Sequence, residues 1–196
     1  MIFSRAHSRI MNKKDKILKV ALELFTEFGF HGTPTSKIAK EADVANGTLF
    51  HYFKTKEDLI VEIYINIRTK LGEYISQDIE QKAQVKDKLQ HLYLNYLYWA
   101  LENKAESKFI QLFRFSPYVA NLPKKELQVG KRFYLDAIEQ GKSEGVIKLK
   151  ESDFIVMLLA THAHGVHSYL LGNKFSKSRQ HQVINETFEL VWRMLT

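Results

Sequence analysis

Apolar residues recur at helical spacing along most of this chain, and that periodicity restricts the fold more than any other feature of the sequence. In the first such segment they occupy one face, at positions i, i+4, i+7, i+8 and i+11: Ile17, Ala21, Leu24, Phe25 and Phe28. Gly29 follows at once, where glycine commonly ends a helix. There are only three prolines, and no regular spacing of turn signals indicates strands. The sequence therefore predicts an all-α protein.

Two short helical segments follow the first one. Thr35 is placed to cap a helix whose apolar face includes Ile38 and Ala39. Asp43 interrupts that helix, and a third helical piece covers residues 46–53. Two short helices joined by a tight turn, with another helix ahead of them, predict a helix-turn-helix unit.

The rest of the chain is expected to form longer helices. Thr55 and Asp58 fit a capping box, which predicts a fourth helix to about residue 76. Residues 85–101 are apolar or aromatic on nearly every side, as in the central helix of a bundle. Further helices are expected near residues 107–115, 124–144, 153–171 and 178–195. The predicted architecture is an N-terminal three-helix domain with a helix-turn-helix, followed by a larger helical bundle, about nine helices in total.

Several functional classes are disfavoured by what the sequence lacks. It contains no cysteine, which excludes disulfide scaffolds and thiol catalysis and is compatible with a cytoplasmic location. It shows no phosphate-binding glycine loop, Gly-x-Ser-x-Gly elbow or His-Glu-x-x-His pair, so we expect neither an enzyme nor a bound cofactor. The longest uninterrupted apolar stretch, residues 154–160, is far shorter than the roughly 20 residues of a membrane span, and no membrane partner is expected.

The third helical piece carries residues suited to a DNA groove. Gly47 allows the backbone to approach DNA closely, because no side chain intervenes. Asn46 and Thr48 are short hydrogen-bonding residues that can reach base edges or phosphates. Leu49 and Phe53 are four residues apart and are expected to point back into a small core. The net charge of +7 also suits a polyanionic partner.

Residues 29–59 resemble the DNA-binding segment of the tetracycline-repressor (TetR) family of bacterial regulators; they read GFHGTPTSKIAKEADVANGTLFHYFKTKEDL. The similarity covers about residues 13–60. Carried over by position, the resemblance implies DNA contacts from ten residues: Thr35, Ser36, Ala45, Asn46, Gly47, Thr48, Phe50, His51, Tyr52 and Lys56. Among these, Lys56 would meet the phosphate backbone.

The chain departs from the family pattern at three positions. Phe50 stands where members often have tyrosine, so a phenolic contact to phosphate is lost. Ala45 stands where a capping serine is common, which removes a cap worth roughly 0.5–2 kcal/mol in other helices. Asp43 replaces a usual glycine, which is tolerable because aspartate can adopt left-handed backbone geometry.

The resemblance also implies two tasks for the larger C-terminal part, namely sensing a small molecule and pairing subunits. Pairing has a physical motive, because two recognition helices about one DNA turn or a multiple of it apart can read a palindrome. We therefore expect a flexible arm at residues 1–11, a helix-turn-helix DNA-binding domain at 12–56, and a helical ligand-binding and dimerisation domain at 57–196.

Candidate residues for both tasks can be named. Those that could line an effector cavity are Tyr64, Tyr93, Tyr96, Trp99, Phe113, Arg114, Phe133 and Tyr134. Aromatic walls would suit a flat or greasy effector. Those that could form the homodimer interface are Phe154, Leu158, Thr161, His164, Ser168, Phe188 and Trp192. For both sets, ordinary core packing within one chain is the alternative.

Three neighbouring histidines raise the question of a metal site. His164 and His167 are three residues apart and can share a helix face, whereas His162 lies off it. Histidines packed at an interface are the more common outcome, so no metal is expected.

Two function hypotheses follow. The first is a ligand-responsive transcriptional regulator, a repressor that binds a palindromic DNA operator as a homodimer and is released by a small, largely apolar or aromatic effector. The second is a helical ligand- or metal-sensing protein whose helix-turn-helix-like segment is only structural.

Overall fold

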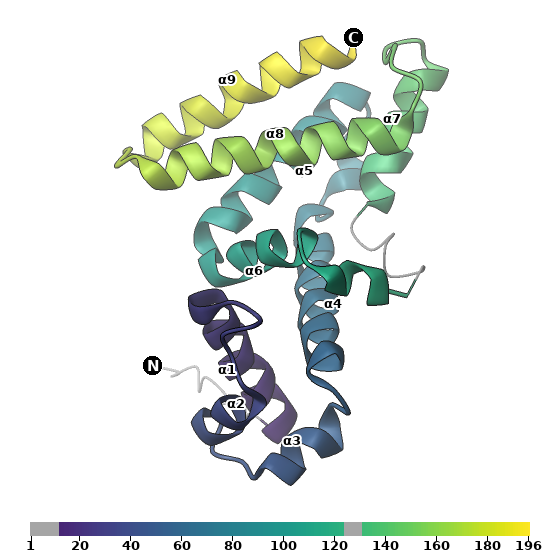
Figure 1. Ribbon diagram of the computed structural model, residues 1–196. Helices are drawn as coiled ribbons and strands as arrows, with labels where there is room; N and C mark the ends of the chain where they lie inside the picture. Colours follow the sequence, from purple (N-terminus) through teal and green to yellow (C-terminus); the bar gives the residue numbers. More distant parts are fainter. Residues whose placement is uncertain (1–11, 124–130) are drawn as a thin grey trace, which may run out of the picture. The chain divides into compact units, whose positions relative to one another are not determined.

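The computed structural model describes residues 12–123 and 131–196 of the chain. In chain order the described helices are α1 (Lys13–Phe28), α2 (Thr35–Glu41), α3 (Asn46–Tyr52), α4 (Lys56–Ile75), η1 (Ile79–Gln81), α5 (Val85–Glu102), α6 (Lys104–Arg114), η2 (Pro117–Asn121), α7 (Arg132–Ser143), α8 (Ser152–Gly172) and α9 (Lys177–Leu195) (Figure 1). These residues form no strand, so the all-α prediction is confirmed. The expected arm at residues 1–11 and the start of the helix expected from residue 124 lie outside the described residues.

The helices divide into two packing units. The first unit holds residues 12–63 and 108–121, and the second holds the other described residues. Helix α4 contributes its first part, to Ile63, to the first unit and its remainder to the second. The sequence-based division at residue 56 therefore differs from the packing, which also assigns residues 108–121 to the N-terminal helices.

An aromatic cluster explains why residues 108–121 belong to the first unit. The Phe30 ring lies edge-on to Phe109 and to Tyr118, in each case with ring centroids 5.4 Å apart. Phe25 also contacts Phe30, at 5.4 Å, and Phe109, at 6.3 Å. A buried aromatic side chain removes roughly 150–250 Å² of surface from water. These contacts therefore give residues 108–121 a strong reason to pack with the N-terminal helices, although they are distant from them in the sequence.

Helix α1 ends at Gly29 as its sequence predicts, and a side-chain cap that was not predicted marks its start. The Asn12 side chain accepts a hydrogen bond from the Asp15 N–H, at 2.9 Å, which caps the helix. Gly29 ends the helix with a φ of 74°, a left-handed value that glycine adopts without strain. The expectation that Phe28 lies on the buried face is wrong, because its side chain is 45% exposed. The chain turns directly after it, and Phe30 takes the buried place instead.

The starts of the next helices are decided by local hydrogen bonds. The predicted cap from Thr35 is wrong, because α2 begins after Pro34 with no side-chain cap. The predicted capping box at α4 is confirmed: the Thr55 N–H donates to Asp58, and the Asp58 N–H donates to the Thr55 hydroxyl, each at 3.0 Å. The left-handed geometry expected at Asp43 is also confirmed, with a φ of 54°.

The second unit is built around α5, as its all-round apolar sequence predicts. Helix α5 packs against α7, α8 and α9, and α8 packs against α9. Its largest fully buried side chain is Tyr93, which lies against the Phe188 ring at 5.6 Å. Gly141 of α7 faces Val85 and Ile147 so closely that an added Cβ would come within 2.9 Å of both side chains.

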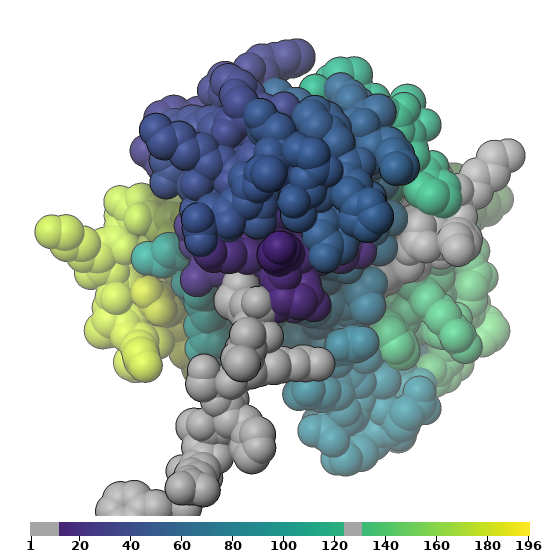
Figure 2. All heavy atoms as spheres, turned by 90° about the horizontal axis from the view of Figure 1, so that it is seen from below, coloured from purple at the N-terminus to yellow at the C-terminus, as the bar shows by residue number. Residues whose placement is uncertain are grey.

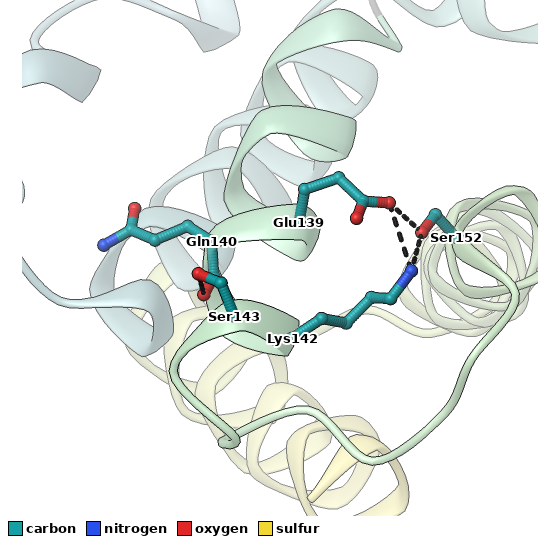
Figure 3. A network of polar contacts seen from close by, with 5 residues as sticks. All are labelled: Glu139, Gln140, Lys142, Ser143 and Ser152. Atoms are coloured by element: carbon teal, nitrogen blue, oxygen red, sulfur yellow. Dashed lines mark hydrogen bonds and ion pairs between the residues drawn. The ribbon is translucent and has the colours of Figure 1, made fainter.

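A polar cluster ties the end of α7 to the start of α8 (Figure 3). The Lys142 ammonium donates to the Ser152 hydroxyl, at 2.9 Å, and pairs with Glu139, at 3.2 Å. The Ser152 hydroxyl in turn donates to Glu139. These contacts join the two ends of the connecting loop. The hydrogen bond from Ser152 is the largest cause that lowers the pKa of the Glu139 carboxyl, and the hydrogen bond from Lys142 is the second.

By length and average composition, α8 is the one helix in the described ranges that could cross a membrane. The core helix of a soluble bundle passes the same test. Ile155, Leu159 and Val166 of α8 are buried, whereas its exposed side carries both polar residues, such as Thr161, and apolar ones, such as Met157. Because α8 packs against α5, α7 and α9, we interpret it as a bundle helix.

Candidate nucleic-acid interface

Helix α3 turns one face inward and leaves the other free. Leu49 is fully buried and Phe53, just past the helix, is 3% exposed, as expected for the two core-facing residues. Ile38 and Ala39 of α2 are buried on the other side of that small core. The end of the molecule that carries α2, the turn and α3 faces the viewer in Figure 2, in blue.

The candidate DNA-contacting residues are placed as follows. Seven of the ten residues are exposed: Ser36, Ala45, Asn46, Gly47, Phe50, His51 and Tyr52. The other three, Thr35, Thr48 and Lys56, are half-buried. All of the side chains on α3 that the sequence assigned to DNA are thus at least partly accessible. Their contacts with DNA remain predictions.

Gly47 has no reason within the chain to be glycine. A Cβ added at this position would meet nothing within 4 Å, and its backbone is not left-handed. At Gly32, by contrast, an added Cβ would lie 2.4 Å from the Phe28 carbonyl oxygen. Glycine inside a helix costs about 0.5–1 kcal/mol relative to alanine. The described part of the chain gives no packing benefit that offsets this cost, and the surface at Gly47 is open to a partner.

Large aromatic side chains flank Gly47 on the exposed side of α3. Phe50 is 42% exposed and Tyr52 is 41% exposed. The Tyr52 ring lies edge-on to His51, with centroids 5.5 Å apart. As predicted from the alanine at position 45, no side chain caps the start of this helix.

The side chain of Lys56, at the start of α4, lies beside an aromatic ring of α1. Its ammonium lies 5.9 Å from the centroid of the buried Phe25 ring. Burial lowers the pKa of Lys56, and the neighbouring Glu57 carboxylate opposes that change. Its contact with a phosphate stays a prediction.

Sequence reasoning missed Lys37, which stands in α2 beside an exposed ring. The Lys37 ammonium lies 3.6 Å from the centroid of the Phe28 ring, close enough for a cation–π interaction. The available signal was a lysine early in α2 together with a phenylalanine at the last position of α1. Because apolar periodicity predicts that this phenylalanine, Phe28, lies on the buried face of α1, it was not paired with Lys37.

The candidate effector-lining residues do not all lie in one unit. Tyr93, Tyr96 and Trp99 are buried on α5, while Tyr64, Phe133 and Tyr134 are half-buried, and these six belong to the second unit. Phe113 and Arg114 belong to the first unit. Phe113 is fully buried there and stacks on Phe109, at 6.5 Å, so it serves the aromatic cluster.

A network of hydroxyl and imidazole groups lies inside the second unit. The Tyr93 hydroxyl is 2.9 Å from His162 Nδ1, and the Tyr96 hydroxyl is 3.0 Å from His164 Nδ1. The Tyr93 hydroxyl also lies 3.3 Å from the Thr187 hydroxyl. Burial raises the pKa of Tyr93 to about 12, so it stays a neutral hydroxyl at physiological pH.

Arg68 is a functional candidate that sequence reasoning missed. Burial raises the pKa of Tyr134, the neighbouring Tyr96 adds to the rise, and the positive charge of Arg68 opposes it. The guanidinium of Arg68 therefore acts on the Tyr134 hydroxyl. Its position four residues after Tyr64, on the same face of α4, was the signal that could have pointed to it.

Comparisons with known proteins agree with one another. The model of bacterial regulatory proteins of the tetR family matches residues 17–63, and that of the tetracyclin repressor-like C-terminal domain matches residues 64–196. The HTH-type transcriptional regulator QacR of Staphylococcus aureus is 30% identical over 188 residues, which cover 85% of this chain and 96% of that protein. The chain belongs to the TetR family.

One further relative and two solved structures are similar to this TetR protein in sequence or in fold. The fatty acid metabolism regulator protein of Bacillus subtilis is 42% identical over 77 residues, but these cover only 38% of each chain. The crystal structure of a tetR family transcription regulator from Shewanella sp. PV-4 matches with a TM-score of 0.87 at 28% identity, over 94% of this chain and 98% of that one. FadR of Bacillus subtilis, solved in complex with stearoyl-CoA, matches in fold with a TM-score of 0.78 at 22% identity, over 92% and 98%.

These matches confirm the predicted function class: this is a ligand-responsive transcriptional regulator of the TetR family. Members of this family are DNA-binding regulators rather than enzymes. The alternative of a purely structural helix-turn-helix loses its basis, because the N-terminal match covers the DNA-binding segment itself.

The residues predicted for the TetR subunit interface differ in exposure. Phe154, Thr161 and Ser168 are exposed on α8, and Leu158, His164 and Trp192 are half-buried. Phe188 is fully buried within its own chain, so its side chain is not on the surface where a second subunit would pack. Four further large side chains on α8 and α9 are more than half exposed and were not among the predicted interface residues: Met157, Tyr169, Leu190 and Met194.

The three neighbouring histidines of α8 are occupied by other partners. His162 and His164 bond to tyrosine hydroxyls of α5, and His167 Nε2 lies 3.1 Å from the Ala100 carbonyl oxygen. Across the two described ranges, no three His, Cys, Asp or Glu side chains are grouped so that they could hold a metal ion.

Proposed function

We propose that this TetR protein binds a palindromic operator as a homodimer and represses transcription until a small, largely apolar effector binds its second unit. The observation that carries the DNA-binding part is Gly47. A helical glycine with open space around it reduces stability, and close approach of a DNA backbone or base edge supplies the compensating benefit.

The exposed apolar side chains on α8 and α9 support the homodimer. Met157, Leu190 and Met194 each expose more than half of their surface on two helices that pack together. Clustered exposed apolar groups mark interaction sites in soluble proteins. A second copy of the chain would cover them and hold two α3 helices for a palindromic site.

The interior of the second unit supports an effector with a large apolar part and one polar end. Buried aromatic side chains of α5 supply apolar contacts, while Tyr134 and Arg68 supply a hydroxyl and a positive charge. The relative FadR was solved with stearoyl-CoA, which combines a long alkyl chain with an anionic head. We infer that this chain responds to an effector of that general class.

Binding to DNA selected from a randomised duplex library tests the proposal. The protein should bind the selected duplexes as a dimer, and the logarithm of affinity should fall linearly with the logarithm of salt concentration. Failure to enrich any duplex would overturn the DNA-binding function.

Adding stearoyl-CoA to the complex then tests the effector class, with coenzyme A as the matched control. Release by the acylated compound and not by coenzyme A is the expected result. Equal effects of the two would exclude the alkyl chain as the recognised part.

A further inference from the structure

Phe50 is a large apolar side chain exposed at the centre of the proposed DNA face. It exposes 42% of its surface on a seven-residue helix whose Leu49 is completely buried and whose Tyr52, which carries a hydroxyl, is 41% exposed. At 100° per residue, Phe50 lies on the same flank of α3 as Asn46, one turn further along. Gly47 is three residues before it and is therefore its neighbour on the helix surface.

The chemistry of phenylalanine restricts what Phe50 can recognise. Its ring has no hydrogen-bond donor or acceptor, so it cannot bond to a phosphate oxygen or to a polar base edge. In the major groove the one apolar group that distinguishes a base is the C5 methyl of thymine. The space left open at Gly47 lets the helix approach closely enough for the adjacent ring to reach the base edges.

We propose that Phe50 is a specificity-determining residue that reads thymine through its C5 methyl group, so that each operator half-site carries a thymine at the position facing Phe50. This proposal rests on the proposed DNA binding and adds the identity of a contacted base. Asn46, on the same flank, would read the neighbouring base through its amide. The alternative is that the ring packs on a deoxyribose, which does not depend on the base.

Replacing thymine with deoxyuridine tests the proposal, because this change removes the methyl group and keeps every hydrogen-bonding group of the base pair. A selected operator is substituted at one thymine position at a time, and each duplex competes with the original for the full-length protein. Burial of one methyl corresponds to about a fourfold change in affinity. We expect a weakening of that size at one or two positions in each half-site.

The Phe50→Ala variant assigns the effect to the ring. It should bind the thymine and deoxyuridine duplexes equally at the sensitive positions, while the control variant Phe115→Ala, at an exposed phenylalanine outside the proposed DNA contacts, should keep the full discrimination. If Phe50→Ala binds too weakly, the comparison is repeated at lower salt, where phosphate contacts strengthen binding to all duplexes. Thermal unfolding of both variants confirms that they are folded.

The possible outcomes separate this proposal from the proposed function. If the wild-type protein binds its operator but shows no deoxyuridine penalty at any position, the thymine contact is overturned and DNA binding stands. A penalty that persists in Phe50→Ala also overturns the role of the ring. If no duplex is bound at all, the proposed function itself fails.

Discussion

The Lys56 ammonium lies 5.9 Å from the centroid of the Phe25 ring, so the first residue of α4 is directed toward α1. Burial lowers its pKa. A cation–π contact at an exposed site contributes about 0.5–1 kcal/mol, so Phe25 holds this lysine only weakly. A contact between Lys56 and a phosphate stays a prediction.

Replacing Lys56 with alanine should weaken binding to all DNA sequences alike. The loss of one phosphate contact should reduce the slope of log affinity against log salt by about 0.9. Gel-shift titrations at several salt concentrations measure this slope, with Lys70→Ala, an exposed residue of α4 in the second unit, as the control. An unchanged slope in Lys56→Ala would mean that the lysine stays with Phe25 on the DNA.

Gly47→Ala should change stability and DNA binding in opposite directions. Alanine favours the helix and meets no neighbouring atom, so the free energy of unfolding should rise by about 0.5–1 kcal/mol. The new methyl group should obstruct DNA and weaken operator binding. Chemical denaturation and gel shift on the same preparation measure both quantities, and operator affinity as strong as that of the wild type would contradict the close approach.

Phe109→Ala should destabilise the first unit although it lies far from the DNA-binding helices in the sequence. Its ring is fully buried against Phe25 and Phe30, and truncation of such a residue costs about 3–5 kcal/mol. Phe115→Ala is the matched control, because Phe115 is 89% exposed and its loss should change stability by less than about 0.5 kcal/mol. Urea unfolding followed by circular dichroism distinguishes the two; equal effects would exclude the aromatic cluster as part of this unit.

Acidification should destabilise the second unit through its buried histidines. Burial lowers the pKa of both His162 and His167, so the unfolded chain takes up protons at a higher pH than the folded chain does. Stability should be complete above about pH 6.5, the ordinary histidine pKa, and should fall as the pH drops below it. Thermal unfolding at several pH values should show that acidification destabilises the double variant His162→Gln/His167→Gln less than it destabilises the wild type.

Charged substitutions on the exposed apolar residues of α8 and α9 should separate the subunits. Met157→Glu and Leu190→Glu each place a carboxylate where a second copy is proposed to pack, and an unpaired charge buried at an interface is strongly unfavourable. Sedimentation velocity should show monomers for both variants and dimers for the wild type and for Lys70→Glu. Dimers that persist in both variants would exclude this face as the interface.

The helices and their local signals were predictable because they depend on near neighbours in the sequence. The Thr55–Asp58 capping box and the left-handed Asp43 each need only a few residues to specify them. Periodicity also identified Leu49 and Phe53 as core residues of the helix-turn-helix.

Features that depend on distant contacts were not predictable in the same way. Periodicity marks an apolar face but does not say what covers it, so the pairing of Phe30 with Phe109 could not be read from the sequence. For the same reason Phe188 was assigned to a subunit interface, whereas it packs on Tyr93 within the chain. Side-chain direction at Lys56 depends on the Phe25 ring, which lies on another helix.

The continuity of α4 bears on how chimeric regulators could be made from this protein. One unbroken helix serves the first unit as far as Ile63 and the second from Tyr64 onward, so no loop is available there at which to splice two parents. A donor segment that ended at residue 63 would also leave Phe25 and Phe30 without the side chains that cover them. Transplanted DNA specificity should therefore require residues 108–121 to travel with the N-terminal helices, or a new aromatic cluster to be fitted at the graft.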